Sequence, residues 1–272
     1  SGKDAEGHLG SPLRILRTIK TYKHDILKKQ NKIKVILNEY ESEKLEELKK
    51  RVNDFSISKE LRKLISIEFY DQPFKKLFNS KYEQLNNQPN LIFIDQYGIK
   101  QVTGETFQKI IDLTSTDFLF FISSSFMKRF AKRKEFKNYF PDIYKIINNA
   151  KYEDIHRIVL DYYKNKIPEN NKTKLYPFTI KKGSNIYGLV FGSKHPLGVD
   201  KFLDLAWKKN KINGEANFDI DKDVEKSQGV LFSELQKQTK KYLFENKLKN
   251  FILSHDEITN KDVYLFILDE GY

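Results

Sequence analysis

The sequence feature that most constrains the fold is the mostly apolar run of residues 90–94, which is followed by Asp95, Gln96, Tyr97 and Gly98. A continuous apolar run of this length is typical of a strand buried on both faces, as in the centre of a parallel sheet. Open α/β sheets hold their ligands at the carboxyl ends of such strands. We therefore expect these four residues to border an active site; the alternative is that Asp95 only caps the following turn.

Strands and helices alternate along the first half of the chain. Further strands are expected at residues 32–37, 64–69 and 117–122. This alternation predicts a parallel, doubly wound α/β sheet with right-handed crossovers. Two more of its strands end in acids, Glu39 and Asp71. Because the carboxyl ends of parallel strands share one edge, we expect the carboxylates of Glu39, Asp71 and Asp95 to converge on one crevice.

A β-hairpin is predicted in the second half of the chain. Residues 176–181 and 186–191 have strand patterns and are separated by a Gly-Ser turn. Two antiparallel strands that close a parallel sheet are a specific topological feature. His195 follows, before a proline and a further helix, and we interpret it as a turn residue rather than as a catalyst.

Basic and aromatic side chains interleave over residues 126–137. Such a segment could bind phosphates and stack on bases. The alternative is an amphipathic helix with phenylalanines in the core and lysines in water. The candidate nucleic-acid-binding residues are Lys128, Arg129, Lys132, Arg133 and Lys134.

The composition narrows the class of protein. A net charge of +12 favours a polyanionic partner, DNA or RNA, although a lysine-rich surface could also reflect biased codon usage. The absence of cysteine excludes disulfides, thiolate metal sites and a cysteine nucleophile. With no run of 18 apolar residues and no signal-peptide pattern, we expect a cytoplasmic protein without a membrane span.

The acids permit an adenosine cofactor. A carboxylate that follows the strand at residues 32–37 can accept hydrogen bonds from both ribose hydroxyls, which makes Glu39 the candidate and Glu41 the alternate. Asp71 could accept a hydrogen bond from the adenine amine. A phosphate-binding loop and a complete dinucleotide motif are both absent, so S-adenosylmethionine (SAM) is the economical choice. Residues 213–225 only partly match a calcium loop, and we expect no metal site.

Asp95, Gln96 and Tyr97 are the candidate catalytic residues. The Asp95 carboxylate and a backbone carbonyl beside it can accept hydrogen bonds from an amino group and so orient the nitrogen lone pair toward a methyl donor. Tyr97 can stack on a base flipped out of its helix. Positioning of this kind supplies most of the rate in a group transfer.

At these residues the chain resembles the three-Cys-motif partner (TcmP) protein family. The matching segments are Gly10-Ser11-Pro12-Leu13, Phe93-Ile94-Asp95-Gln96-Tyr97-Gly98, Phe121 to Ser125 with Arg129-Phe130, Lys194-His195-Pro196-Leu197-Gly198 through Ala206-Trp207, and Asn213 to Phe218. The likeness covers nearly the whole chain. The family resembles class I SAM-dependent methyltransferases and is usually found beside a radical-SAM-like protein with three cysteines, which makes such a protein an expected partner.

The resemblance implies a Rossmann-like methyltransferase sheet closed by an antiparallel hairpin. We assign residues 1–210 to this domain, with a helical insertion at about 126–166, and residues 211–272 to a helical extension, whose small helices suggest a winged-helix-like module. Two departures stand out. Gln96 replaces the usual proline, and the first strand of the family's fold lies upstream of Ser1, so that Gly2 is the end of the cofactor-binding glycine loop.

Three functions follow from these observations. The first is a SAM-dependent methyltransferase acting on nucleic acid, with an exocyclic amine of a base as target. The second is a non-catalytic subunit that binds nucleic acid or a partner on a degenerate methyltransferase fold. The third is a protein methyltransferase or an assembly factor for a partner enzyme.

Overall fold

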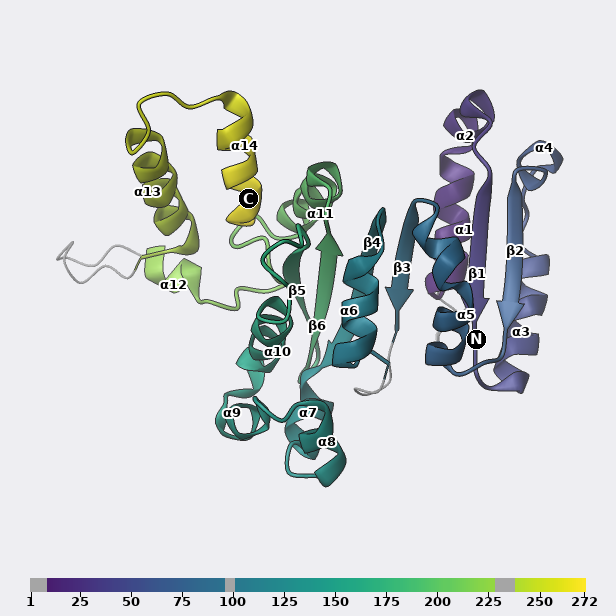
Figure 1. Ribbon diagram of the computed structural model, residues 1–272, viewed down its shortest axis with the longest axis horizontal. Helices are drawn as coiled ribbons and strands as arrows, with labels where there is room; N and C mark the ends of the chain where they lie inside the picture. Colours follow the sequence, from purple (N-terminus) through teal and green to yellow (C-terminus); the bar gives the residue numbers. More distant parts are fainter. Residues whose placement is uncertain (1–8, 96–100, 228–237) are drawn as a thin grey trace. The chain divides into compact units, whose positions relative to one another are not determined.

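The computed structural model describes residues 9–95, 101–227 and 238–272. The chain is an α/β protein that divides into two compact units, Ser1–Tyr82 and Glu83–Tyr272, and each is described by itself (Figure 1). Among the described residues, no helix combines the length and the apolar character that crossing a bilayer requires.

The first unit is built on two parallel strands, β1 (Ile33–Asn38) and β2 (Ile65–Tyr70). Its helices are α1 (Ser11–Thr21), α2 (Lys23–Lys29), α3 (Ser42–Asn53), α4 (Lys59–Arg62) and the part of α5 (Phe74–Asn86) that ends at Tyr82. Apolar residues at helical spacing in α1 and α3 pack on alternate residues of β1. This core contains Leu13, Leu16, Val35, Leu37, Leu48 and Val52.

The second unit contains a mixed sheet of four strands in the order β3-β4-β6-β5. The strands are β3 (Asn90–Ile94), β4 (Thr116–Ser123), β5 (Lys174–Lys182) and β6 (Asn185–Ser193). β3 and β4 are parallel, whereas β6 is antiparallel to both β4 and β5. The predicted hairpin is therefore confirmed, and Gly183 supplies the positive φ of 59° that its turn requires.

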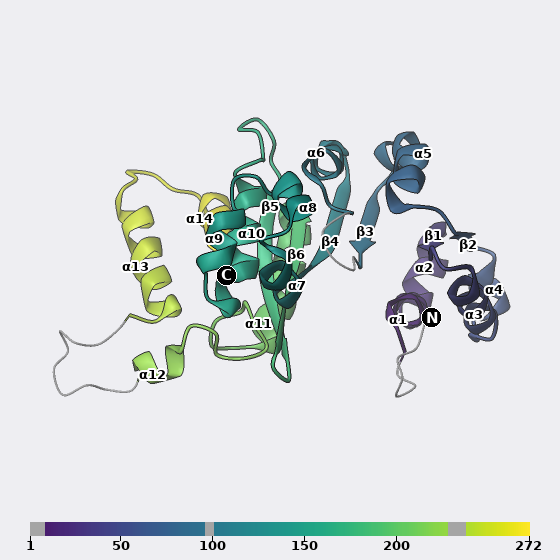
Figure 2. The ribbon, with the colours of Figure 1, turned by 90° about the horizontal axis from the view of Figure 1, so that it is seen from below.

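Helices cover both faces of this sheet. Phe118 and Phe120 of β4 contact Phe107 of α6 (Gly104–Asp112) and Tyr163 of α10 (Ile155–Lys164). The intervening Leu119 points to the opposite face, since side chains alternate along a strand, and packs there with α11 (Pro196–Lys209). Figure 2 shows α6 and α11 on opposite sides of the strands.

The predicted helical insertion lies between β4 and β5. It consists of α7 (Ser124–Phe130), α8 (Lys134–Tyr139), α9 (Tyr144–Asn149), a 3-10 turn (Tyr152–Asp154) and α10. These elements span Ser124 to Lys164. Buried Phe136, Phe140 and Ile147 anchor its short helices to α10.

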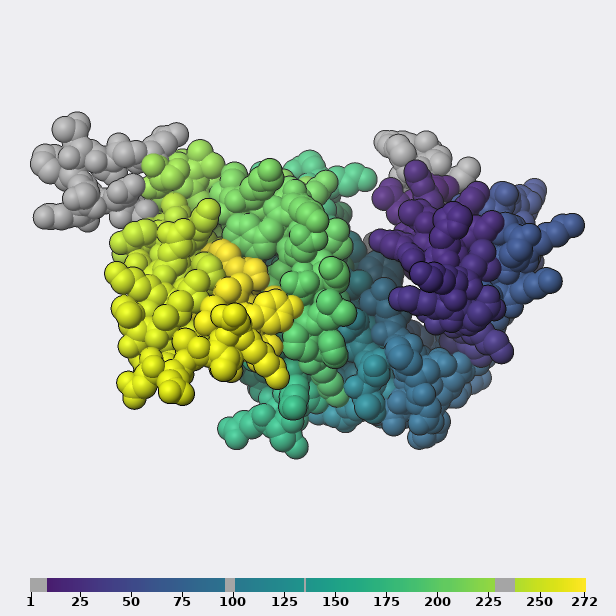
Figure 3. All heavy atoms as spheres, turned by 90° about the horizontal axis from the view of Figure 1, so that it is seen from above, coloured from purple at the N-terminus to yellow at the C-terminus, as the bar shows by residue number. Residues whose placement is uncertain are grey.

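The described part of residues 211–272 is helical, as predicted. It forms α12 (Asp223–Ser227), α13 (Lys240–Leu253) and α14 (Asn260–Asp269). The indole of Trp207 in α11 donates a hydrogen bond to the Gly271 carbonyl at 2.9 Å and stacks on Tyr272. In the space-filling view, the yellow surface of α14 lies against the green surface of α11 (Figure 3). The winged-helix-like arrangement stays a prediction.

The strands differ from the prediction in one respect. We expect one doubly wound sheet, but the described strands form two sheets, with β1 and β3 each hydrogen-bonded to a single neighbour. The α/β class is confirmed, and the Rossmann-like order belongs to the proposal below.

Candidate functional site

Glu39 and Asp71 lie at the same edge of the first unit. Asn38 is paired with Tyr70 at the ends of the parallel strands, and the Glu39 amide donates to the Tyr70 carbonyl at 2.9 Å. The two loops are tied together by Asn38, whose side chain donates to the Gln72 carbonyl and accepts from the Gln72 amide. The strand ends that carry Glu39 and Asp71 therefore lie at one edge of this unit, and the convergence of their carboxylates with that of Asp95 stays a prediction.

Glu39 has the better surroundings for a bound ribose. Its side chain is half-buried, and one carboxylate oxygen accepts a hydrogen bond from the Glu41 amide at 3.2 Å. That bond orients the carboxylate at the start of α3. Asp71 is exposed, whereas the alternate, Glu41, forms an ion pair with Lys44 at 2.6 Å. Tyr40, 68% exposed, adds an aromatic face beside Glu39.

Asp95 belongs to the second unit. It is exposed and directly follows the buried Ile94, which pairs with Phe120 of β4. The parallel register places Asp95 at the edge where β4 ends at Ser123, whose hydroxyl accepts a hydrogen bond from the Phe126 amide and so caps α7. The predicted partners of Asp95 in catalysis, Gln96 and Tyr97, lie outside the described residues, as does Gly2.

The predicted basic residues divide into two groups. Lys128 is half-buried and donates to the carbonyls of Ile147, Asn148 and Ala150, so that its ammonium group caps the end of α9. The guanidinium group of Arg133 lies 4.3 Å from the ring centre of Phe130. The side chains of Arg129, Lys132, Arg133 and Lys134 are exposed.

A basic cleft of about 330 Å³ lies in the helical insertion. Its lining residues are Ala131, Lys132, Lys137, Tyr144, Lys145, Asn148 and Asn149. Of the five predicted residues, only Lys132 lines it. Lys145, Asn148 and Asn149 were missed because they belong to α9. This helix lies outside the basic segment 126–137 in the sequence and meets it only in the folded chain.

Comparison of the chain with models of protein families and with curated proteins finds no match. The resemblance to the TcmP family therefore stays a prediction of the sequence. The function has to be argued from the residues themselves.

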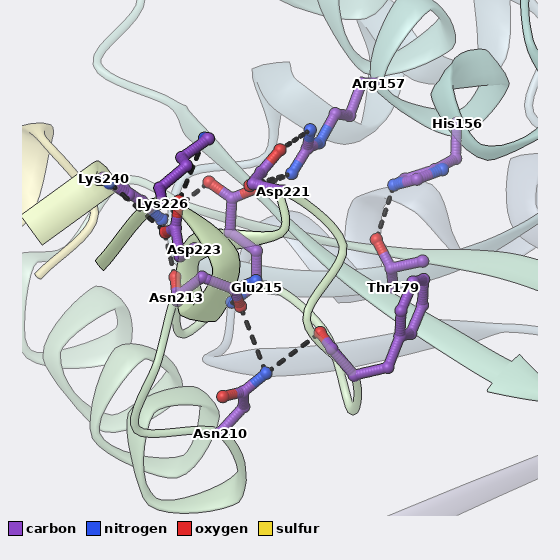
Figure 4. Close-up of polar contacts among 11 residues, drawn as sticks. His156, Arg157, Thr179, Asn210, Asn213, Glu215, Asp221, Asp223, Lys226 and Lys240 are labelled. Carbon is purple, nitrogen blue, oxygen red and sulfur yellow. Dashed lines mark hydrogen bonds and ion pairs between the residues drawn. The ribbon is translucent and has the colours of Figure 1, made fainter. Parts of the chain in front are cut away.

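A network of charged side chains joins α10 to the segment before α13 (Figure 4). Arg157 donates to both carboxylate oxygens of Asp221, at 2.7 and 2.8 Å, and to Glu215 at 2.9 Å. Lys240 pairs with the other oxygen of Glu215 at 2.7 Å and donates to the Asn213 carbonyl at 2.8 Å. Hydrogen bonding from Arg157 lowers the pKa of the Asp221 carboxyl.

This network includes the acidic segment 213–225, which only partly matches a calcium loop. Asp219 accepts hydrogen bonds from the amides of Asp223 and Val224, and the 3% exposed Asp223 accepts from Lys226 and from the Lys240 amide. Glu215, Asp219, Asp221 and Asp223 are therefore engaged in pairs and caps. Among the described residues, no group of three or more His, Cys, Asp or Glu side chains is placed to hold a metal ion.

Two histidines have structural positions. His195 is the N-cap of α11, where its Nδ1 accepts a hydrogen bond from the Leu197 amide, so the turn interpretation is confirmed. His156 is 1% exposed, and its Nε2 lies 2.5 Å from the Thr179 hydroxyl. Burial lowers the pKa of His156 to about 4, so its imidazole is neutral at pH 7.

Proposed function

We propose that this chain is a SAM-binding, methyltransferase-like protein that acts on nucleic acid, at an exocyclic amine of a base. The observation that carries the proposal is the strand order β3-β4-β6-β5, in which an antiparallel hairpin closes a parallel pair. This is the closure that the resemblance implies for the methyltransferase sheet. Asp95 follows β3 at the carboxyl end, where open α/β sheets hold ligands.

The first unit fits the adenosine part of SAM. The half-buried Glu39 carboxylate is oriented by the Glu41 amide and keeps acceptor capacity for the two ribose hydroxyls. Asp71, at the same edge, offers an acceptor for the adenine amine. When bound, SAM would supply an electrophilic methyl group.

Asp95 would hold the target amine. As an exposed carboxylate at a strand end, it can accept a hydrogen bond from an exocyclic NH₂ group and orient the nitrogen lone pair. Tyr97 would stack on the flipped base, and the backbone at Gln96 would supply a second acceptor. These two roles are part of the proposal and rest on the sequence alone.

The test is transfer of the tritiated methyl group of SAM to DNA and RNA. We expect label in one of the two nucleic acids with the wild-type chain and none with Asp95→Ala. The control is Asp112→Ala, which removes an exposed acid at the end of α6 in the same unit. Circular dichroism establishes that both variants are folded. Absence of label in either nucleic acid, or full activity of Asp95→Ala, would overturn the proposal.

The basic cleft favours a second candidate, a subunit that binds nucleic acid without catalysing transfer. The replacement of the usual proline by Gln96 agrees with it. This candidate predicts salt-sensitive binding that SAM neither strengthens nor weakens. A titration of nucleic acid with and without SAM separates the two functions.

A further inference from the structure

Positive charge is concentrated in the helical insertion. Residues 124–151 contain eight Lys or Arg and two acids, a net charge of +6 that is half of the +12 of the whole chain. The remaining 244 residues therefore carry a net charge of only +6. Such a concentration on short helices produces a local field for anions, which codon bias across the whole chain would not produce.

The basic cleft lies within this segment. Three exposed lysines, Lys132, Lys137 and Lys145, come to it from the α7–α8 turn, from α8 and from α9. None of the described residues that line the cleft is acidic. An anion that enters it therefore meets three ammonium groups and, among the lining residues that the structure describes, no carboxylate.

Two contacts fix the walls of the cleft. The Lys137 ammonium lies 5.1 Å from the centre of the Tyr144 ring, so α8 and α9 are held together across it. Lys128 bonds three carbonyls at the end of α9 and fixes the backbone that carries Asn148 and Asn149. The lining lysines are thus presented on a backbone that is already in place, which reduces the entropy lost on binding.

The asparagines add a second kind of contact. Asn148 is half-buried and Asn149 is exposed, and each carries an amide with both donors and an acceptor. Side-chain amides can form hydrogen bonds with sugar hydroxyls and with base edges. Ammonium groups that pair with phosphates do not distinguish one base from another. The cleft therefore combines phosphate-binding charges with groups suited to the rest of a nucleotide.

We propose that this cleft binds the phosphodiester backbone of a single-stranded nucleic acid. Its volume of about 330 Å³ is near the lower end of roughly 300–1,000 Å³ for small-molecule pockets, which suits one nucleotide of a flexible strand. A flexible single strand can fold its backbone around the three lysines, whereas a duplex is stiff over this length. The site deepens the proposed function by naming the form of its nucleic-acid partner, and it does not depend on SAM binding.

The test compares three variants of the full chain by fluorescence anisotropy with labelled oligo(dT), oligo(U) and a duplex of equal length. The cleft variant is K132Q/K137Q/K145Q. The charge-matched control is K209Q/K211Q/K249Q, which replaces three exposed lysines outside the insertion. The conservative variant, K132R/K137R/K145R, keeps the charge of the cleft.

We expect the cleft variant to lose single-strand affinity on the order of 100-fold at about 0.1 M salt, with a salt slope less steep by about 2, because three phosphate contacts are lost. The control should change less than about threefold, and the arginine variant should retain binding. If the cleft variant loses affinity for both oligonucleotides, the cleft recognises the phosphodiester backbone that DNA and RNA share. If it loses affinity for only one, the cleft is specific for that nucleic acid.

Three results would overturn the proposal. The first is unchanged single-strand binding by the cleft variant, and the second is a loss of affinity in the control variant equal to that in the cleft variant. The third is wild-type binding to the duplex that is as tight as to the single strands and that the cleft variant weakens as much. Calorimetry of SAM with the same cleft variant keeps the two proposals apart. SAM binding there is expected to equal that of the wild type, and its absence in both proteins would count against the methyltransferase proposal alone.

Discussion

Arg157 and Asp221 form a bidentate ion pair: Nη1 of the arginine donates to Oδ1 of the aspartate at 2.7 Å, and Nη2 donates to Oδ2 at 2.8 Å. Sixty-four residues separate them in the sequence. The pair therefore fixes the segment before α13 to α10, and with it the base of the C-terminal helices. Four predictions concern this part of the chain and its neighbours.

Arg157→Ala is expected to destabilise the second unit by about 2 kcal/mol or more, because it leaves the partly buried Asp221 without its ion-pair partner and Glu215 with Lys240 alone. Urea unfolding followed by the fluorescence of Trp207, the only tryptophan, reports on this unit. Lys208→Ala breaks an exposed pair with Asp204 and should change stability by less than about 0.5 kcal/mol. Equal effects of the two substitutions would contradict the buried role of Arg157.

His156 is expected to make stability depend on pH. Its folded pKa, about 4, is below the ordinary value of 6.5, so below pH 6.5 the unfolded chain binds the proton more readily. Stability should fall by up to about 3 kcal/mol as the pH drops from 6.5 to 4. His156→Gln should flatten the curve in this window, as measured by urea unfolding at several pH values. An unaltered slope would show that other groups cause it.

Gly188→Ala is expected to destabilise the hairpin, because a Cβ at this position would lie 2.5 Å from the Cβ of His156. Overpacking of this kind costs about 1–3 kcal/mol. Gly104→Ala is the matched control, since nothing lies within 4 Å of the added methyl group at the start of α6. It should be neutral or stabilising by up to about 1 kcal/mol. Thermal unfolding of both variants measures the difference.

Lys128→Gln and Arg129→Gln remove one charge each from neighbouring positions of α7. The first should lower stability by about 1–2 kcal/mol, because the half-buried ammonium group caps α9 through three carbonyls. The second removes an exposed guanidinium group and should leave stability unchanged within about 0.5 kcal/mol. If the two variants unfold alike in urea, Lys128 is not the cap that its contacts indicate.

Local patterns predicted the elements well, for physical reasons. The apolar run at residues 90–94 forms β3, and the Gly-Ser turn forms the hairpin, because strand pattern and turn geometry are encoded by adjacent residues. The expected burial of β3 on both faces was wrong: Ile94 is its one buried residue, Leu91 is 66% exposed, and β4 is the only described strand that pairs with it. The acids Glu39 and Asp71 share an edge because both follow parallel strands in register. His195 caps a helix because it directly precedes the proline that begins it.

Contacts between distant segments were not predictable from one sequence. Arg157 has no local signal that pairs it with Glu215 and Asp221, and nothing in the spacing of Lys128 separates a buried cap from an exposed phosphate ligand. The cleft likewise joins Lys132 with Lys145, from different helices. Periodicity indicates which face of a helix is buried but not which partner it meets.

The most direct measurement for the proposed function is calorimetric titration of SAM into the wild-type chain and into Glu39→Ala and Glu41→Ala. Glu39 would accept the ribose hydroxyls, whereas Glu41 pairs with Lys44. We predict binding with one site, weakened about 10-fold or more by Glu39→Ala, since a charged hydrogen bond contributes about 1.5–3 kcal/mol, and unaltered by Glu41→Ala. No heat of binding with the wild type, or equal affinity in all three proteins, would contradict the account.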